Sequence, residues 1–226
     1  MTRIVLIHAT RVAMSPIEEA FKRLWPDAET ISILEEGLSA DAASGRVDSN
    51  ELNRRINVLA DYAMDLAPDA ILYTCSAFGT GIEAASARLD IPVLKPNEAM
   101  FEAAVANGGN VTMLYTFPPA VKGMELEFTE ESNRRSTPAT LTSVAVSGAL
   151  AALKEGDGQT HDQLIAQAAA DIADTDAIVL AHFSMSRAAD AVRARTDIPV
   201  LTSPDAAIEK LKRILGSANA KGTLQC

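Results

Sequence analysis

The pentapeptide Asp90-Ile91-Pro92-Val93-Leu94 occurs twice in this chain, the second time as Asp197-Ile198-Pro199-Val200-Leu201. The two copies are 197 − 90 = 107 residues apart. The same offset, 176 − 69 = 107, relates Asp69-Ala70-Ile71 to Asp176-Ala177-Ile178. Over the 30 aligned positions that begin with these tripeptides, 11 are identical and no gap is needed. Self-similarity at a fixed spacing indicates a duplicated structural unit.

The offset also relates the beginnings of the two copies, where Ile4-Val5-Leu6-Ile7 aligns with Val111-Thr112-Met113-Leu114. The alternative is chance similarity between two βα segments of an alanine-rich protein. Chance would then have to give the same spacing of 107 residues for three separate segments. We therefore predict two homologous lobes, an N-terminal lobe of residues 1–106 and a C-terminal lobe of residues 107–226.

Hydrophobic periodicity predicts that strands alternate with helices in both lobes. Short apolar runs typical of buried strands cover residues 3–8, 30–34, 70–73, 92–94, 111–115, 141–145, 177–180 and 200–201. Apolar residues at helical spacing cover 16–24, 52–66, 79–89, 98–106, 122–131, 161–172, 186–195 and 204–215. This alternation is typical of parallel sheets covered by helices. We expect an α/β fold of two pseudo-symmetric lobes, with the active site in the cleft between them.

Two segments do not follow this pattern. Residues 35–51 are polar, contain two glycines and follow a predicted strand, which makes this segment a candidate lid over the cleft, and whether it closes is left open by the sequence. Residues 216–226 are mostly small and polar, and we expect them to be frayed.

Composition narrows the class of protein. Of the 226 residues 48% are hydrophobic, and 20 Lys and Arg against 30 Asp and Glu give a formal net charge of −10. That charge disfavours a nucleic-acid partner. No apolar run approaches the roughly 18 residues that cross a bilayer, and the N-terminus lacks the features of a signal peptide. The two cysteines, Cys75 and Cys226, make no disulfide framework. We therefore expect a cytoplasmic protein that acts on a small molecule, with no nucleic-acid or membrane partner.

Ligands of open parallel sheets bind beyond the carboxyl ends of the strands. Cys75 lies at such a place, between the strand that ends at Tyr73 and the helix that begins at Gly79. A helix N-terminus favours a thiolate and lowers the pKa of a cysteine. Around it, small residues such as Ser76 and Ala77 leave backbone N–H groups available to an anion. Cys75 is therefore a candidate catalytic residue, and the alternative is a buried, inert thiol.

His182 occupies the position equivalent to Cys75, because 75 + 107 = 182. It also lies between a strand and the start of a helix. If the lobes face each other about a pseudo-twofold axis, this imidazole and the thiol lie on opposite sides of a small molecule and form an acid–base pair. The alternative for His182 is a structural histidine.

Other polar groups at the strand ends are candidate substrate-binding residues. The first strand of the N-terminal lobe ends in His8-Ala9-Thr10, and Thr116, Phe183 and Ser184 follow strands of the C-terminal lobe. Hydroxyls and an imidazole there could hydrogen-bond a carboxylate, and backbone N–H groups could stabilise negative charge on the substrate. The three histidines lack the spacing of metal ligands, so we expect neither a metal nor another cofactor.

These strand-end segments resemble those of the aspartate/glutamate/hydantoin racemase superfamily. Thr74-Cys75-Ser76-Ala77-Phe78 is similar to the segment of the family's first catalytic cysteine, and Ile178–Met185 to that of the second. Thr116 resembles the threonine that helps to hold the substrate carboxylate. The resemblance covers nearly the whole chain. It implies a two-lobed α/β fold and a cofactor-independent isomerase that uses two thiols on opposite faces of the α-carbon.

The chain departs from that pattern at His182, which replaces the second cysteine. Three functions follow. The first is a racemase or epimerase of a small amino acid or related compound, with Cys75 and His182 as the two acid–base groups. The second is a related lyase or cis–trans isomerase of a small (di)carboxylic acid, with Cys75 as nucleophile or proton donor. The third is a protein that binds a small ligand without turnover. Homo-oligomers are common among such enzymes, and the sequence leaves the number of subunits open.

Overall fold

The computed structural model describes residues 1–222. By their internal contacts these residues form two compact units. The first unit consists of Met1–Pro96 and the C-terminal segment from Ala207, and the second is Asn97–Ala206. The second unit thus begins ahead of residue 107, where the second copy of the sequence repeat starts, and residues 207–222 belong to the first unit.

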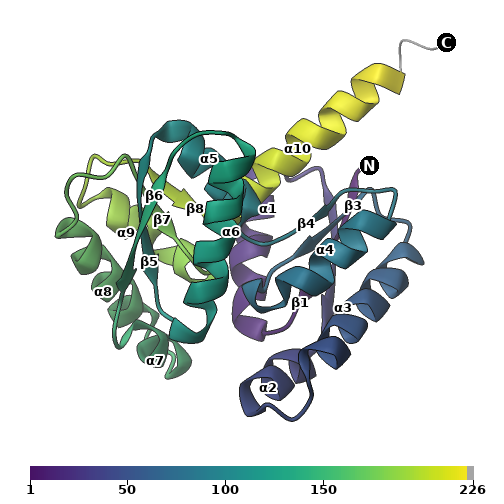
Figure 1. The fold of residues 1–226 in the computed structure, drawn as a ribbon, viewed down its shortest axis with the longest axis horizontal. Helices are drawn as coiled ribbons and strands as arrows, with labels where there is room; N and C mark the ends of the chain where they lie inside the picture. The colour runs from purple at the N-terminus through teal and green to yellow at the C-terminus, as the bar shows by residue number, and fades with distance from the viewer. Residues whose placement is uncertain (223–226) are drawn as a thin grey trace. The chain divides into compact units, whose positions relative to one another are not determined.

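The first unit contains a four-stranded parallel sheet in the order β2-β1-β3-β4. Its strands are β1 (Arg3–His8), β2 (Glu29–Leu34), β3 (Ala70–Tyr73) and β4 (Val93–Leu94). Its helices are α1 (Met14–Leu24), α2 (Glu36–Ser44), α3 (Ser49–Met64), α4 (Gly79–Arg88) and most of α10 (Ser203–Gly222), with the short 3₁₀ helices η1 (Arg11–Ala13) and η2 (Ser76–Phe78). Helices α3 and α4 lie side by side along this sheet (Figure 1).

The second unit repeats this plan with a parallel sheet in the order β6-β5-β7-β8. Its strands are β5 (Asn110–Tyr115), β6 (Thr140–Ala145), β7 (Ala177–Leu180) and β8 (Val200–Thr202). Its helices are α5 (Glu98–Asn107), α6 (Val121–Arg134), α7 (Ala149–Lys154), α8 (Gly158–Ala170) and α9 (Ala189–Arg193), with η3 (Pro118–Ala120) and η4 (Phe183–Ala188). The predicted α/β class, with two similar lobes of parallel strands flanked by helices, is confirmed.

Strand alternation explains the layers of the second unit. Leu180 packs into a cluster with α7, α8 and α9, whereas its neighbours Val179 and Ala181 pack with α5 and α6. The helices therefore cover both faces of the sheet (Figure 1). In the first unit Val5, Ile7 and Tyr73 form a core with α3 and α4. All four residues of β3 and of β7 are buried, which is why these strands read as continuous apolar runs.

Two segments for which the sequence analysis expected no helix are partly helical. The candidate lid, residues 35–51, contains α2 over 36–44 and the beginning of α3 at Ser49. Residues 216–222 belong to α10, and the remainder of the predicted tail, 223–226, lies outside the described residues. Helix α7 was not predicted.

In the described part of the chain no helix combines the length and the apolar character that a membrane span requires.

Close packing of α3 against α4 depends on Gly81. A Cβ at this position would lie 3.2 Å from the Cα of Asn53 and 3.2 Å from the Cβ of Ile56, and both belong to α3. Because backbone cannot yield as a side chain does, we expect Gly81→Ala to lower the free energy of unfolding by about 1–3 kcal/mol. Urea unfolding followed by circular dichroism measures this loss.

Gly79→Ala is the matched control in the same helix. Gly79 has an ordinary helical φ of −48°, and a Cβ there would meet no described atom within 4 Å. We expect this substitution to be neutral or stabilising by up to about 1 kcal/mol. Equal losses in the two variants would contradict the packing argument.

Candidate active site

The carboxyl end of the first sheet brings together the residues that follow β1 and β3. These strands are neighbours, with Ile7 opposite Tyr73, and the N–H of Thr74 donates to the carbonyl of Ile7 at 3.0 Å. The segment Thr74-Cys75 therefore leaves the sheet beside His8. The sheet register thus places the predicted residues of this lobe at one edge.

Cys75 connects β3 to η2 in extended backbone conformation, with φ −126° and ψ 124°. Its half-buried side chain packs against the core under α3 and α4. The thiol accepts a hydrogen bond from the backbone N–H of Ala77 and contacts the hydroxyl of Ser39. Ala77 thus already directs its N–H to sulfur in the free protein.

The direction of the Cys75 pKa differs from our sequence prediction. We expected a helix N-terminus to lower it, but burial of the thiol raises the pKa, and the hydrogen bonds from Ala77 and Ser39 offset only part of that shift. Helix α4 begins at Gly79, four residues after Cys75, with η2 between them. Loss of hydration therefore outweighs these two hydrogen bonds in setting the pKa of the thiol.

Ser39 was not identified from the sequence. It lies in α2, within the segment predicted to be a lid, and no local pattern marks it. Only the packing of α2 beside the end of β3 brings its hydroxyl to Cys75. Part of the predicted lid segment thus belongs to the surroundings of the thiol.

His8 is fully buried and hydrogen-bonded inside the first unit. Its Nδ1 lies 2.8 Å from Oγ1 of Thr74, and its Nε2 lies 3.2 Å from Oγ of Ser32. Burial lowers the pKa of His8 to about 4, so the ring is neutral at pH 7. Because the Thr74 hydroxyl can donate its proton to the carbonyl of Ile7, this network favours a proton on Nδ1.

The other predicted residues of this lobe lie at the same edge. Thr10 and Ser76 are half-buried and Ala77 is exposed. Thr10 directly precedes η1, and Ser76 and Ala77 lie in η2. Their roles in substrate binding stay predictions.

In the second unit, the pairing of β5 with β7 brings His182 close to the end of β5, as the pairing of β1 with β3 does for Cys75 and His8 in the first unit. Leu114 lies opposite Leu180, and the backbone N–H of Phe117 donates to Nε2 of His182 at 3.3 Å. A backbone N–H can only donate, so Nε2 carries the lone pair and the ring proton lies on Nδ1. Burial lowers the pKa of His182 to about 4, which makes the neutral ring the resting form at pH 7.

Thr116 lies next to this pair and is 8% exposed. Its buried hydroxyl has no hydrogen-bond partner among the described residues. A buried hydroxyl without a partner is costly, and a ligand that supplies an acceptor would remove that cost. Phe183 and Ser184 are buried in η4, and Phe117, which the sequence analysis did not single out, is 41% exposed.

Comparison with known proteins gives a clear result for the fold. No family model and no curated protein matches the sequence at a significant level. The solved glutamate racemase from Bacillus anthracis has a TM-score of 0.74 at 14% identity, covering 96% of this chain and 82% of its own. An allantoin racemase from Klebsiella pneumoniae has a TM-score of 0.74 at 16% identity, and the match covers 96% of this chain and 89% of the allantoin racemase. An aspartate racemase from Picrophilus torridus has a TM-score of 0.70 at 15% identity, and the match covers 96% of this chain and 95% of the aspartate racemase.

The chain has the racemase fold. The resemblance inferred from the strand-end segments is thereby confirmed at the level of fold. Within this racemase fold, Cys75 and His182 occupy equivalent positions, because each lies two residues beyond the last residue of an equivalent strand, Tyr73 of β3 or Leu180 of β7. Among the described residues, no group of three His, Cys, Asp or Glu side chains is placed to hold a metal ion.

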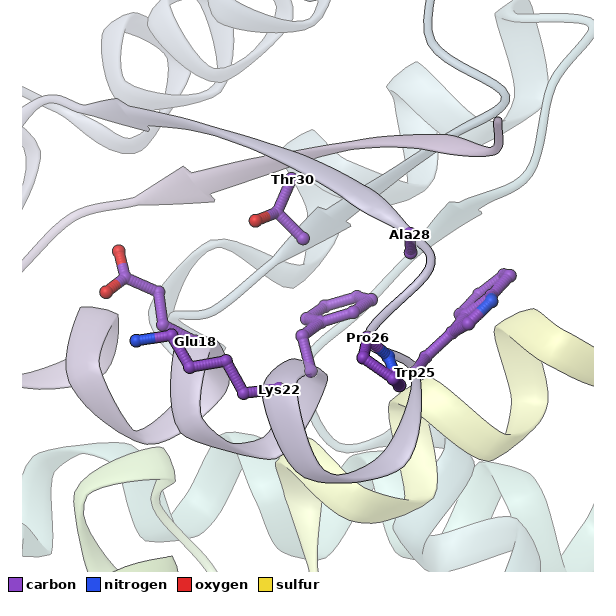
Figure 2. Close-up of a pocket in the computed structure, with 7 residues that line it drawn as sticks. Glu18, Lys22, Trp25, Pro26, Ala28 and Thr30 are labelled. Atoms are coloured by element: carbon purple, nitrogen blue, oxygen red, sulfur yellow. The ribbon is translucent and has the colours of Figure 1, made fainter.

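A pocket of about 250 Å³ lies elsewhere in the first unit (Figure 2). It is formed by the second half of α1 and the beginning of β2, and its lining residues are Glu18, Phe21, Lys22, Trp25, Pro26, Ala28 and Thr30. Thr30 is the second residue of β2, so the pocket lies toward the amino end of a parallel strand. Ligands of such sheets bind at the opposite edge, where Cys75 lies, and we do not place the reaction in this pocket.

Proposed function

We propose that this protein is a cofactor-independent racemase or epimerase of a small amino acid or related compound. The reaction exchanges the proton on the carbon α to a carboxylate or carbonyl group. In this proposal Cys75 and His182 face opposite sides of that carbon. The observation that carries it is the equivalence of these two residues, at matching strand ends, within the racemase fold.

The protonation states support a complementary acid–base pair. At pH 7 the resting protein has a neutral thiol at Cys75 and a neutral imidazole at His182, because burial disfavours the charged form of each. One enantiomer loses its α-proton to Nε2 of His182 and receives the Cys75 proton on the opposite face. The products of that step are the other enantiomer, a thiolate and an imidazolium, which together catalyse the reverse conversion.

Proton transfer to His182 requires its hydrogen bond with Phe117 to break. Nε2 holds the only free lone pair of the ring, and the N–H of Phe117 occupies it at 3.3 Å. That distance is beyond the usual range of N–H hydrogen bonds, so the bond is weak and easily exchanged for the substrate. In this mechanism the unpartnered hydroxyl of Thr116 donates to the substrate carboxylate.

The cation beside the end of β1 is already paired with a carboxylate, which favours a substrate with at most one carboxylate. Arg11 is the cation nearest in sequence to the end of β1 that could hold a second carboxylate. Its Nε and Nη2 instead donate to Oε2 of Glu36, at 3.0 and 2.8 Å. The exposed ring of Phe117 offers an apolar contact. We propose a neutral amino acid or a cyclic amide of the hydantoin type as substrate.

Solvent isotope exchange tests this function. The protein is incubated in deuterium oxide with panels of neutral amino acids, hydantoins and substituted malonates, and loss of the α-hydrogen signal is followed by proton NMR. We expect exchange with one panel together with loss of optical rotation. Release of carbon dioxide or a shifted double bond would instead support the lyase or isomerase function. Binding of a panel member without turnover would support the ligand-binding function.

A further inference from the structure

We propose that Ser39 is a positioning residue for Cys75, and that Arg55 holds the helix that presents it. This inference deepens the proposed function and rests on it for the catalytic role of Cys75. Ser39 contacts the thiol from α2, and the neighbouring Leu38 of that helix belongs to the hydrophobic cluster against which Cys75 packs. Leu38 is the only fully buried residue of α2.

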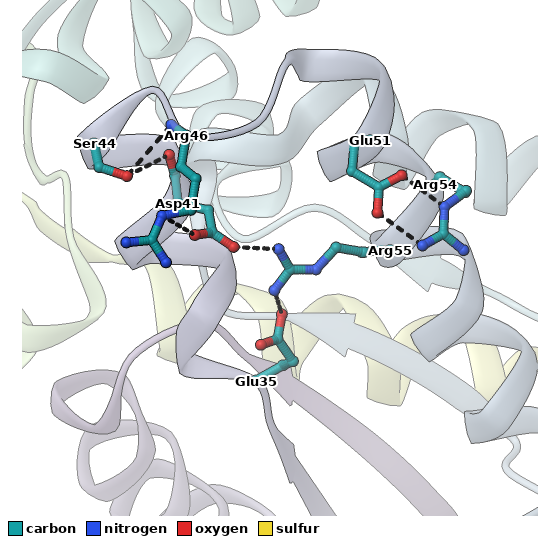
Figure 3. A network of polar contacts seen from close by, with 7 residues as sticks. All are labelled: Glu35, Asp41, Ser44, Arg46, Glu51, Arg54 and Arg55. Carbon is teal, nitrogen blue, oxygen red and sulfur yellow. Dashed lines mark hydrogen bonds and ion pairs between the residues drawn. The ribbon is translucent and has the colours of Figure 1, made fainter.

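The guanidinium of Arg55, in α3, joins both ends of the segment that contains Ser39. Its Nη2 lies 2.5 Å from Oε2 of Glu35, and its Nη1 lies 2.6 Å from Oδ2 of Asp41 (Figure 3). The three side chains are only 22%, 30% and 19% exposed. Such partly buried, two-sided pairing of Arg is stronger and more directional than an ordinary surface ion pair. Arg55 therefore fixes the residue before α2 and its second turn together.

Gly37 gives this guanidinium the space that it needs. A Cβ at position 37 would lie 2.8 Å from Nη2 of Arg55 and 2.6 Å from Oε1 of Glu35. Any larger residue would displace one partner of the ion pair. The local sequence and the ion pairs thus act together to hold α2 against α3.

The chemistry of the contact explains why its position matters. A hydroxyl that donates to sulfur stabilises the thiolate more than the thiol, because the hydrogen bond is stronger to the charged form. Cys75 becomes a thiolate once it has delivered its proton, at a place where burial opposes that charge. Ser39 and the N–H of Ala77 then supply two donors to the same sulfur. The carboxylates nearest to Ser39 in sequence are Glu35, Glu36 and Asp41, and all three are paired, Glu36 with Arg11 and the other two with Arg55.

The test is the pH dependence of Cys75 alkylation by iodoacetamide, in a Cys226→Ser background so that only one thiol reacts. We expect Ser39→Ala to raise the midpoint by about one pH unit, which lowers the rate about tenfold below that midpoint. Ser39→Thr keeps the hydroxyl and should restore the midpoint of the parent protein. Arg55→Gln should shift the midpoint in the same direction as Ser39→Ala, with no further shift in the double variant.

Ser44→Ala is the matched control, since Ser44 is also in α2 but donates to the carbonyl of Asp41 at 3.2 Å. It should leave the midpoint unchanged. Equal midpoints in Ser39→Ala and the parent protein, or equal shifts in Ser39→Ala and Ser44→Ala, overturn the proposal. Alkylation requires no turnover. A shift in Ser39→Ala without isotope exchange on any substrate would therefore reject the proposed function while supporting the role of Ser39.

Discussion

Cys75→Ala is expected to lower the rate of α-hydrogen exchange by about 10³-fold or more. The thiol is the only acid–base group that the proposed reaction has on its side of the α-carbon, and general acid–base groups typically contribute about 10²–10⁴ in rate. The measurement is the NMR exchange assay on the substrate that reacts with the parent protein. Because the alanine variant also removes a side chain packed against the core of the first unit, its folding is checked by circular dichroism.

The control for this variant is Cys226→Ser, which changes the other cysteine of the chain and should keep the full rate. His182→Ala should reduce the rate by a similar factor, whereas His182→Cys places a second thiol at the equivalent strand end and should retain part of it. Full exchange activity in both Cys75→Ala and His182→Ala would refute the two-base mechanism.

Acidification is expected to remove about 3 kcal/mol of stability through His8 alone. The pKa of His8 is about 4 in the folded protein and 6.5 in an unfolded chain, so the unfolded state binds more protons between these values. Stability therefore falls as pH decreases from about 6.5 to 4, at 1.36 kcal/mol for each unit of pKa difference. Below about pH 4 both states are protonated and this contribution to the pH dependence ends.

Urea unfolding at pH 7 and at pH 4.5 measures most of this loss, about 2.4 kcal/mol for these pKa values. His182 has a lowered pKa as well and adds a loss of the same sign, so the contribution of His8 is obtained by difference. His8→Gln keeps hydrogen-bonding groups for Thr74 and Ser32 but does not titrate. We expect a lower stability at pH 7 for this variant and a clearly smaller loss on acidification. The same loss in both proteins would contradict the buried neutral state of His8.

Buried strands were the part of the fold that sequence periodicity located best. The bounds predicted for 3–8, 70–73 and 177–180 agree with those of β1, β3 and β7. These strands are covered on both faces and are therefore apolar without interruption. Helix α2 was missed for the opposite reason. It buries only Leu38, so its sequence carries no amphipathic period.

The candidate site was predictable where the repeat could be used. The offset of 107 marked His182 as the equivalent of Cys75 in the sequence, and each of the two lies two residues beyond the end of an equivalent strand, β3 or β7. Ser39 and Phe117 were not predictable, because each reaches its partner through contacts between segments distant in the chain. Ser39 meets Cys75 from another helix, and Phe117 meets His182 across 65 residues.

The sequence by itself determined the duplicated unit, the parallel α/β class and the residues at the strand ends. These features follow from local apolar runs and from a repeat that can be counted along the chain. Only the tertiary structure decided the protonation state of the site. A helix N-terminus after Cys75 suggested a lowered pKa, but burial raised it, and burial lowered the pKa of His182. Desolvation depends on all the chain segments that surround a group, and no local stretch of sequence contains that information.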